Sequence, residues 1–81
     1  MSDVYRPEGA LTLQTVAGAL AELPPAVARG DITALDFAGV THCDSAGLAL
    51  ILAARRAAAG RPFEIRNLPP RLAQLAELYD V

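Results

Sequence analysis

The chain has 81 residues, of which 53% are hydrophobic, and its formal net charge of -2 comes from 7 basic and 9 acidic side chains. This length fits one domain over residues 1–81, and the hydrophobic content is too high for a disordered chain. Every basic residue is an arginine and these are scattered, apart from the Arg55–Arg56 pair, so the charge pattern excludes the basic surface that nucleic acid requires.

The first quarter of the chain predicts a strand followed by a helix. Residues 1–9 are polar and contain proline and glycine, so they predict a frayed lead-in or a short edge strand, which residues 10–12 complete. Apolar residues at helical spacing predict a first helix over residues 14–23, with Thr12 as its cap. The pair Pro24–Pro25 is expected to end or kink this helix.

A buried strand and a loop follow. Residues 26–29 add a helical turn that Gly30 stops. Residues 32–37 contain β-branched and aromatic side chains, with apolar residues on both faces, which is typical of a central parallel strand. Residues 39–43 are predicted to form a loop.

The second half of the chain predicts a long helix, a short strand and a last helix. Asp44 or Ser45 caps the long helix, which ends just before Gly60. Residues 63–66 alternate as a short strand, and residues 70–79 form the last helix. The buried stripe of that last helix is Leu72, Leu75, Ala76 and Tyr79. Strands that alternate with helices in this way predict an α/β layer with parallel pairing.

The long helix is predicted to have two apolar faces on a wheel of about 100° per residue. One side carries mostly small residues and can lie against a sheet: Ala46, Leu50, Ala53, Ala54 and Ala57. The other side contains arginines and reaches solvent: Ser45, Leu48, Leu52, Arg55, Arg56 and Ala59. Leu48 and Leu52 are therefore expected on or near the surface, as in a protein interface. The alternative is that both pack under the preceding loop or another helix.

The chain offers no signal for secretion or membrane insertion. Cys43 is the sole cysteine, so an intramolecular disulfide is impossible, which fits a reducing compartment. The N-terminus lacks an apolar signal core, and the longest strongly apolar run, residues 46–54, is too short to span a bilayer. We therefore expect a cytoplasmic protein that reaches a membrane, if at all, through a partner.

Residues 35–50, LDFAGVTHCDSAGLAL, resemble the core of STAS domains, which are named for sulphate transporters and anti-sigma-factor antagonists. The family pattern is a buried strand, a loop that leads to D-S/T-x-G, and an apolar helix. The closer resemblance is to the MlaB-like branch. Its three motifs match residues 9–12, 44–50 and 67–79 in the right order, so the resemblance covers nearly all of the chain.

This resemblance implies a STAS-type α/β fold, with a small, mixed but largely parallel sheet and about three helices packed on it. It also implies a non-catalytic subunit that binds the ATPase of an ABC transporter, which handles phospholipids at the inner membrane and maintains lipid asymmetry. The partner-binding residues implied by the resemblance are Asp44, Ser45, Ala46, Gly47, Leu48 and Leu52. The short N-terminal strand region departs from the family and leaves edge pairing open, and a homodimer is compatible with the resemblance.

The residues of the central turn suit a helix start. Asp44 can accept a hydrogen bond from an early helix N–H, and its charge suits the positive end of the helix. Ser45 has two interpretations. It is either a plain capping or contact serine, which the MlaB-like resemblance favours, or a phosphorylation site, as the resemblance to anti-sigma-factor antagonists implies. A phosphate at a helix N-terminus would face free N–H groups.

Catalysis at this turn is not expected. Residues 43–47 keep only the second half of a G-x-S-x-G nucleophile elbow. His42 lies beside Ser45 in sequence, but adjacency does not supply the geometry of a triad. His42, Cys43 and Asp44 are too few and too contiguous for a metal site, and Cys43 has no cationic cluster to activate it. No phosphate-binding loop is present, so the sequence predicts no cofactor, no metal and no enzyme.

Two binding functions remain open on the sequence, beside a third hypothesis from the enzyme class, a Ser45-dependent hydrolase. The first is an accessory STAS subunit that binds the ATPase of a phospholipid-trafficking ABC transporter. The alternative is an anti-sigma-factor antagonist that captures an anti-sigma kinase and is switched by phosphorylation of Ser45.

Overall fold

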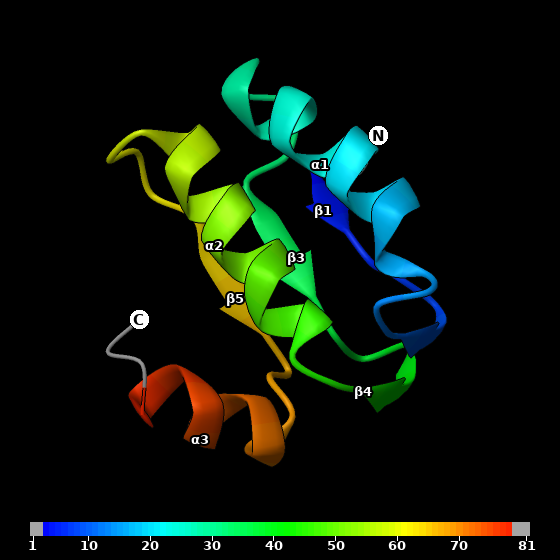
Figure 1. The fold of residues 1–81 in the computed structure, drawn as a ribbon. Coiled ribbons are helices and arrows are strands. Elements are labelled where there is room, and N and C mark those ends of the chain that lie inside the picture. Colours follow the sequence, from blue (N-terminus) through cyan, green and yellow to red (C-terminus); the bar gives the residue numbers. More distant parts are fainter. Residues whose placement is uncertain (1–2, 79–81) are drawn as a thin grey trace.

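The computed structural model describes residues 3–78 and has the predicted α/β class (Figure 1). Its elements in chain order are β1 (Val4–Tyr5), β2 (Gly9–Leu11), α1 (Val16–Ala28), β3 (Ala34–Asp36), β4 (Val40–Cys43), α2 (Ala46–Ala58), β5 (Glu64–Arg66) and α3 (Pro70–Leu78). The three predicted helices are present, and the end of the last one, at Tyr79, lies outside the described residues. The lead-in contains an edge strand, β1, in addition to β2.

The strands form two small sheets in which every described pair is parallel. One sheet has the order β1-β3-β5, and the other pairs β2 with β4. In the first, Leu35 pairs with Tyr5 on one side and with Ile65 on the other. In the second, Leu11 pairs with Cys43. The carboxyl ends of the strands in each sheet therefore meet at one edge.

Helices α1 and α2 lie side by side over one face of the strands, and α3 lies near the end at which α2 begins (Figure 1). The core fills the space between these helices and β3. It contains Leu11, Val16, Ala19, Leu23, Val27, Leu35, Phe37, Ala46, Leu48, Leu50, Ile51, Ala54, Ala58 and Leu72. Because all three helices and β3 contribute to it, the core fixes where the start of α2 lies.

The prediction that Pro24–Pro25 ends the first helix is wrong, because α1 continues through both prolines to Ala28. Each proline removes one helical N–H and leaves the carbonyl four residues earlier without it. Leu23 and Val27 flank the pair and are both almost fully buried. Their burial stabilises the helical path through the prolines. Gly30, with a φ of +81°, follows the end of the helix as expected.

The segment predicted as a loop, residues 39–43, contains strand β4. Its pairing with β2 explains the difference, because a neighbouring strand favours an extended backbone and the two ends of β4, Val40 and Cys43, are partly buried. The start of α1 also differs from the prediction. Thr15, not Thr12, is the residue before the helix.

Helix α2 begins and ends close to its predicted bounds. Ser45 stands immediately before it, and Ala59 follows it in the left-handed region with a φ of 52°. Gly60 comes next with a φ of +85°, which glycine adopts without strain. The predicted stop at Gly60 is confirmed.

A buried carboxylate, that of Asp36, joins the ends of three strands. Its Oδ1 accepts hydrogen bonds from the Ala38 backbone N–H at 2.8 Å and from the Asn67 side-chain amide at 2.9 Å. Its Oδ2 accepts hydrogen bonds from Arg6, at 3.0 Å from Nη2 and 3.3 Å from Nε. Asp36 is 3% exposed, so these donors replace the water that a carboxylate needs. They come from the residues that follow β1, β3 and β5.

Gly47, in the first turn of α2, lies where α3 and β4 approach the helix. A Cβ atom at this position would be 2.5 Å from the Cys43 Sγ and 2.7 Å from the Leu72 Cδ1. Both distances are far below van der Waals contact, so only glycine lets the three elements pack this closely. The sequence predicts a close backbone approach at Gly47, and the structure shows that the approach comes from the chain itself.

We expect Asp36→Asn to lower the free energy of unfolding at neutral pH. Hydrogen bonds from Asn67 and Ala38, assisted by Arg6, hold the pKa of the Asp36 carboxyl below its usual value. A carboxyl whose pKa is lower in the folded state stabilises the fold above its unfolded pKa of about 3.9, and this stabilisation is lost as the pH falls through the folded pKa.

Urea unfolding of wild type and Asp36→Asn, from neutral pH into the acid range, measures this contribution. The difference between the two proteins should be present at neutral pH and shrink in acid. Asp31→Asn is the control. Both side chains of the Asp31–Arg29 ion pair are exposed, so the pair should contribute little to the free energy of unfolding. A difference that stays constant at every pH would contradict the assignment.

We expect Gly47→Ala and Gly18→Ala to change stability in opposite directions. The new methyl group at position 47 overlaps two neighbours and should cost about 1–3 kcal/mol. At position 18, inside α1, no atom lies within 4 Å of the added Cβ, so the higher helix propensity of alanine should stabilise the protein by about 0.5–1 kcal/mol. Urea unfolding of both variants tests this pair, and a stabilising Gly47→Ala would disprove the packing argument.

Candidate protein-interaction site

The turn between β4 and α2 is built by Asp44. Its side-chain Oδ1 accepts a hydrogen bond of 2.8 Å from the Ala46 backbone N–H, in the geometry by which aspartate closes a turn on its own backbone. The Asp44 backbone N–H donates to the Leu11 carbonyl oxygen at 3.3 Å. The predicted role of Asp44 at the helix start is confirmed, and the turn is also tied to the end of β2.

Ser45 is exposed at the position before the first residue of α2. Its backbone carbonyl accepts hydrogen bonds from the N–H groups of Leu48 at 3.1 Å and Ala49 at 3.2 Å, so its main chain belongs to the helix start. Its side chain makes no capping hydrogen bond to the helix. The capping half of the first interpretation of Ser45 is therefore wrong. The Ser45 residue is exposed and is therefore accessible to a partner.

The face assignment of α2 is wrong at Leu48, which is 7% exposed and belongs to the core. Ala46 and Gly47 are buried as well, while Asp44 and Leu52 are partly buried. Of the six residues predicted to contact a partner, Ser45 alone has an exposed side chain. Asp44 closes the turn, the three residues 46–48 are buried at the start of the helix, and Leu52 lies seven residues further along the chain than Ser45.

The exposed side of α2 next to Ser45 is formed by Ala49, which the sequence-based assignment left out. The error has a physical source. Apolar residues surround the first half of this helix, so a wheel does not determine which side faces the core. The usable signal was helical spacing, because the buried positions 47, 50, 51, 54 and 58 form one stripe and Ala49 lies outside it.

Cys43 and His42 are the two residues before the turn at Asp44. Burial and the neighbouring Asp44 carboxylate raise the pKa of the Cys43 thiol, although a hydrogen bond with the Gly47 backbone opposes them. A thiol with a raised pKa carries little thiolate, which is the nucleophilic form. His42 is exposed on β4, and within residues 3–78 no hydrogen bond joins it to Ser45. The described residues contain no group of three or more potential metal ligands.

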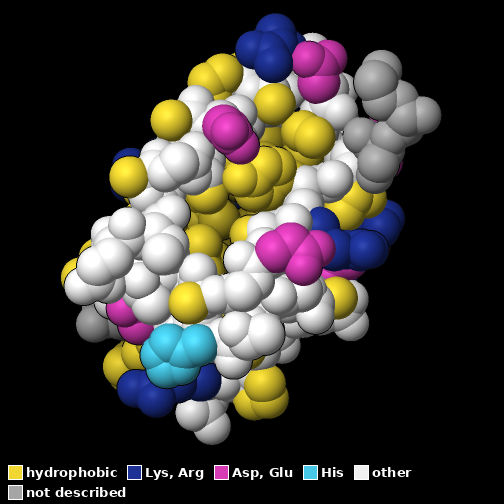
Figure 2. Space-filling view, turned by 90° about the vertical axis from the view of Figure 1, so that its right-hand side faces the viewer, with side chains coloured by type: hydrophobic (Ala, Val, Ile, Leu, Met, Phe, Trp, Pro, Cys, Tyr) yellow, Lys and Arg dark blue, Asp and Glu magenta, His cyan; other side chains and the backbone are white. Residues whose placement is uncertain are grey.

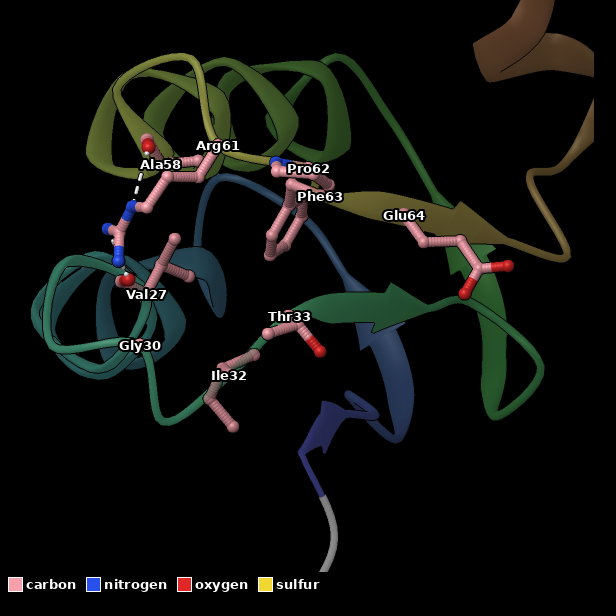
Figure 3. Close-up of a pocket in the computed structure, with 9 residues that line it drawn as sticks. All are labelled: Val27, Gly30, Ile32, Thr33, Ala58, Arg61, Pro62, Phe63 and Glu64. Atoms are coloured by element: carbon pink, nitrogen blue, oxygen red, sulfur yellow. Dashed lines mark hydrogen bonds between the residues drawn. The ribbon is translucent and has the colours of Figure 1, made fainter.

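Two clefts lie away from Ser45. The larger, about 860 Å³, lies at the amino ends of β3 and β5, where apolar side chains including Val27, Ile32 and Phe63 face one another (Figure 3). Its Arg61 guanidinium donates hydrogen bonds to backbone carbonyls at the ends of α1 and α2, 2.9 Å to Val27 and 2.9 Å to Ala58. Arg61 therefore joins two helix ends, where the negative ends of the helix dipoles favour a cation.

The second cleft, about 460 Å³, lies between the β1–β2 segment and α1. Figure 2 shows this side of the molecule, with hydrophobic side chains gathered in a hollow beside acidic ones. Glu8 and Glu22 are among the lining residues, and the Tyr5 hydroxyl donates to the Glu22 Oε2 at 3.3 Å. Burial, together with Glu22, raises the pKa of Tyr5, so the phenol stays protonated and keeps this bond.

Within residues 3–78, no helix combines the length and the apolar character needed to cross a membrane.

Among the solved structures that share this fold are two of SpoIIAA. The anti-sigma factor antagonist SpoIIAA in its unphosphorylated form matches with a TM-score of 0.71 and 24% sequence identity, over 93% of this chain and 72% of that chain. The Bacillus cell fate determinant SpoIIAA in its phosphorylated form matches with a TM-score of 0.68 and 22% identity, over 94% and 72% of the two chains. At these identities the likeness shows the STAS fold. No curated protein sequence matches the chain significantly.

A family model described as "Mlab, STAS domain" matches residues 4–81. STAS domains act through protein–protein interaction, and members of the family are generally non-enzymatic regulatory or interaction domains. The match takes in almost the whole sequence, including the exposed Ser45 and the turn that presents it. The chain therefore belongs to the MlaB-type family of STAS domains.

Proposed function

We propose that this protein is a non-enzymatic accessory subunit that binds the ATPase of a phospholipid-trafficking ABC transporter and thereby helps to maintain lipid asymmetry. The observation that carries the proposal is the exposed Ser45 side chain at the start of α2, in a segment that has the MlaB-like motif. The protein would be cytoplasmic, and its partner would hold it at the inner membrane.

The construction of the turn supports a role in docking. Asp44 fixes the backbone before the helix through its hydrogen bond to Ala46, and Gly47 lets Leu72 pack beneath the first turn. The surface around Ser45 is therefore held in one conformation before any partner arrives. Preorganisation of this kind reduces the conformational entropy that binding would otherwise cost.

The mechanism we propose is allosteric or stabilising. The start of α2 docks on the ATPase through Ser45, with Ala49 and the partly buried Leu52 beside it, and favours the productive assembly of the transporter. A subunit that binds one state of its partner more tightly than another shifts the partner toward that state. No bond is made or broken on this chain, so only its binding free energy acts.

Ser45→Arg should abolish recovery of the ATPase in a pull-down from the native host, because a long charged side chain would occupy the centre of the contact. A loss of at least about 10-fold in affinity is expected for an interface residue of this kind. Gln74→Arg, on the exposed side of α3, is the matched control and should bind as wild type does.

Circular dichroism and urea unfolding should show both variants folded, since both positions are exposed. The proposal would be contradicted if the wild-type protein recovered no ABC ATPase, or if Ser45→Arg recovered as much ATPase as wild type.

An anti-sigma-factor antagonist is the second candidate. The exposed Ser45 hydroxyl favours it, because a kinase needs an accessible acceptor, and SpoIIAA, which shares the fold, has been solved in phosphorylated form. A phosphate at this position would lie at the positive end of α2. Binding to an anti-sigma kinase would then be switched off by modification.

Intact-mass measurement of the protein purified from its host separates the two candidates. Under the first proposal, the mass is that of the unmodified chain, and Ser45→Asp and Ser45→Asn weaken ATPase binding to a similar extent. Under the second, a phosphorylated fraction appears, and Ser45→Asp loses binding to the kinase while Ser45→Ala keeps it. A phosphorylated species that disappears in Ser45→Ala would favour the second candidate.

A further inference from the structure

Leu13 is a large hydrophobic residue that the fold leaves in water. Its side chain is 70% exposed, in the turn between β2 and α1. Among the described residues, Leu78 in α3, at 75%, is the other large hydrophobic side chain with such exposure. Because Leu13 is exposed, it does not contribute the stabilisation that a buried leucine would give. Single exposed leucines are common on protein surfaces, so what distinguishes Leu13 is where its turn lies.

The backbone that carries Leu13 is fixed on both sides. The Thr15 Oγ1 accepts a hydrogen bond of 2.8 Å from the Thr12 backbone N–H and donates to the Ala10 carbonyl oxygen at 2.9 Å. The Thr12 carbonyl oxygen accepts from the N–H groups of Thr15 at 3.0 Å and Val16 at 2.8 Å. Leu13 thus projects from a turn that is closed by four hydrogen bonds. A side chain on a rigid support loses less entropy when it is bound.

The turn that carries Leu13 and the turn that carries Ser45 lie at the same edge of the molecule. Strands β2 and β4 are parallel neighbours, with Leu11 paired to Cys43, so the turns that follow them leave the pair at the same end. The hydrogen bond from the Asp44 N–H to the Leu11 carbonyl oxygen ties the turn at Ser45 to the last residue of β2, two residues before Leu13. Both helices, α1 and α2, start from this edge (Figure 1).

The two chain segments that form this edge carry no charged residue, although Glu8 and Glu22 line the cleft that also contains Thr15. The sequence contains 16 Asp, Glu, Lys and Arg residues, given as 9 acidic and 7 basic, yet residues 9–21 and 45–54 contain none of them. Asp44, between the two segments in space, directs its Oδ1 to the Ala46 N–H. A complementary surface would therefore be uncharged and apolar, because an unpaired charge there would be desolvated on contact.

We propose that Leu13 is an apolar anchor of the contact centred on Ser45, and that it enters an uncharged, apolar recess on the ABC ATPase. This inference rests on the proposed function, since the ATPase is the occupant to which it commits. It adds a second contact element, from the β2–α1 turn, that the motif around Ser45 does not contain. Large apolar side chains near the centre of an interface contribute most of its binding energy.

The test measures the affinity of the purified ATPase subunit for four forms of this chain: wild type, Leu13→Ala, Leu13→Asp and Leu78→Asp. Leu13→Ala should weaken binding about 10-fold, and Leu13→Asp more than that. Leu78→Asp is the matched control, because it changes an equally exposed leucine at the far end of α3 and should bind as wild type does (Figure 1). Urea unfolding should show no loss of stability at either exposed position.

Ser45→Arg, measured in the same series, distinguishes a failure of the role assigned to Leu13 from a failure of the proposed function. If Ser45→Arg loses binding while Leu13→Asp retains it, the role of Leu13 is overturned and the proposed function stands. Equal losses in Leu13→Asp and Leu78→Asp would also overturn it, because the effect would then be a general one of surface charge. If the ATPase does not bind wild type, the proposed function fails, and the assignment of Leu13 fails with it.

Discussion

The Asp36 carboxylate determines how the carboxyl ends of β1, β3 and β5 are assembled. Asp36 is the buried charged residue among those that the structure describes. Its hydrogen bonds come from Arg6, Ala38 and Asn67, which follow three different strands. A buried carboxylate without such donors would be strongly destabilising, so the arrangement of the three strand ends contributes to the stability of the fold. From Asp36 the chain passes through β4 directly to the turn at Ser45.

Three local features shape the site at the start of α2. Asp44 closes the turn, Gly47 admits Leu72 and Cys43 beneath the first turn of α2, and the bulky residues that follow are drawn into the core. Ser45 is the side chain that these features leave facing outward. A small and rigid surface is suited to recognition by another protein, because little order is lost when it is covered.

The local chemistry of the helix starts and stops could be predicted from the sequence, and the orientation of the helix could not. Aspartate at a helix start and glycine after its end have few alternatives, and both were predicted correctly at Asp44 and Gly60. Leu48 was placed near the surface because the wheel lacked tertiary information. The path of α1 through Pro24–Pro25 and the strand β4 likewise depend on neighbours that are distant in sequence.

The central claim is that the surface around Ser45 binds an ABC ATPase, and site-specific photo-crosslinking in the native host tests it most directly. A photo-reactive residue is placed at Ser45 or at the control position Gln74, both of which are exposed. We predict that mass spectrometry identifies the ATPase in the adduct from position 45 and not in that from position 74. An adduct with an anti-sigma kinase, or the same adducts from both positions, would contradict the account.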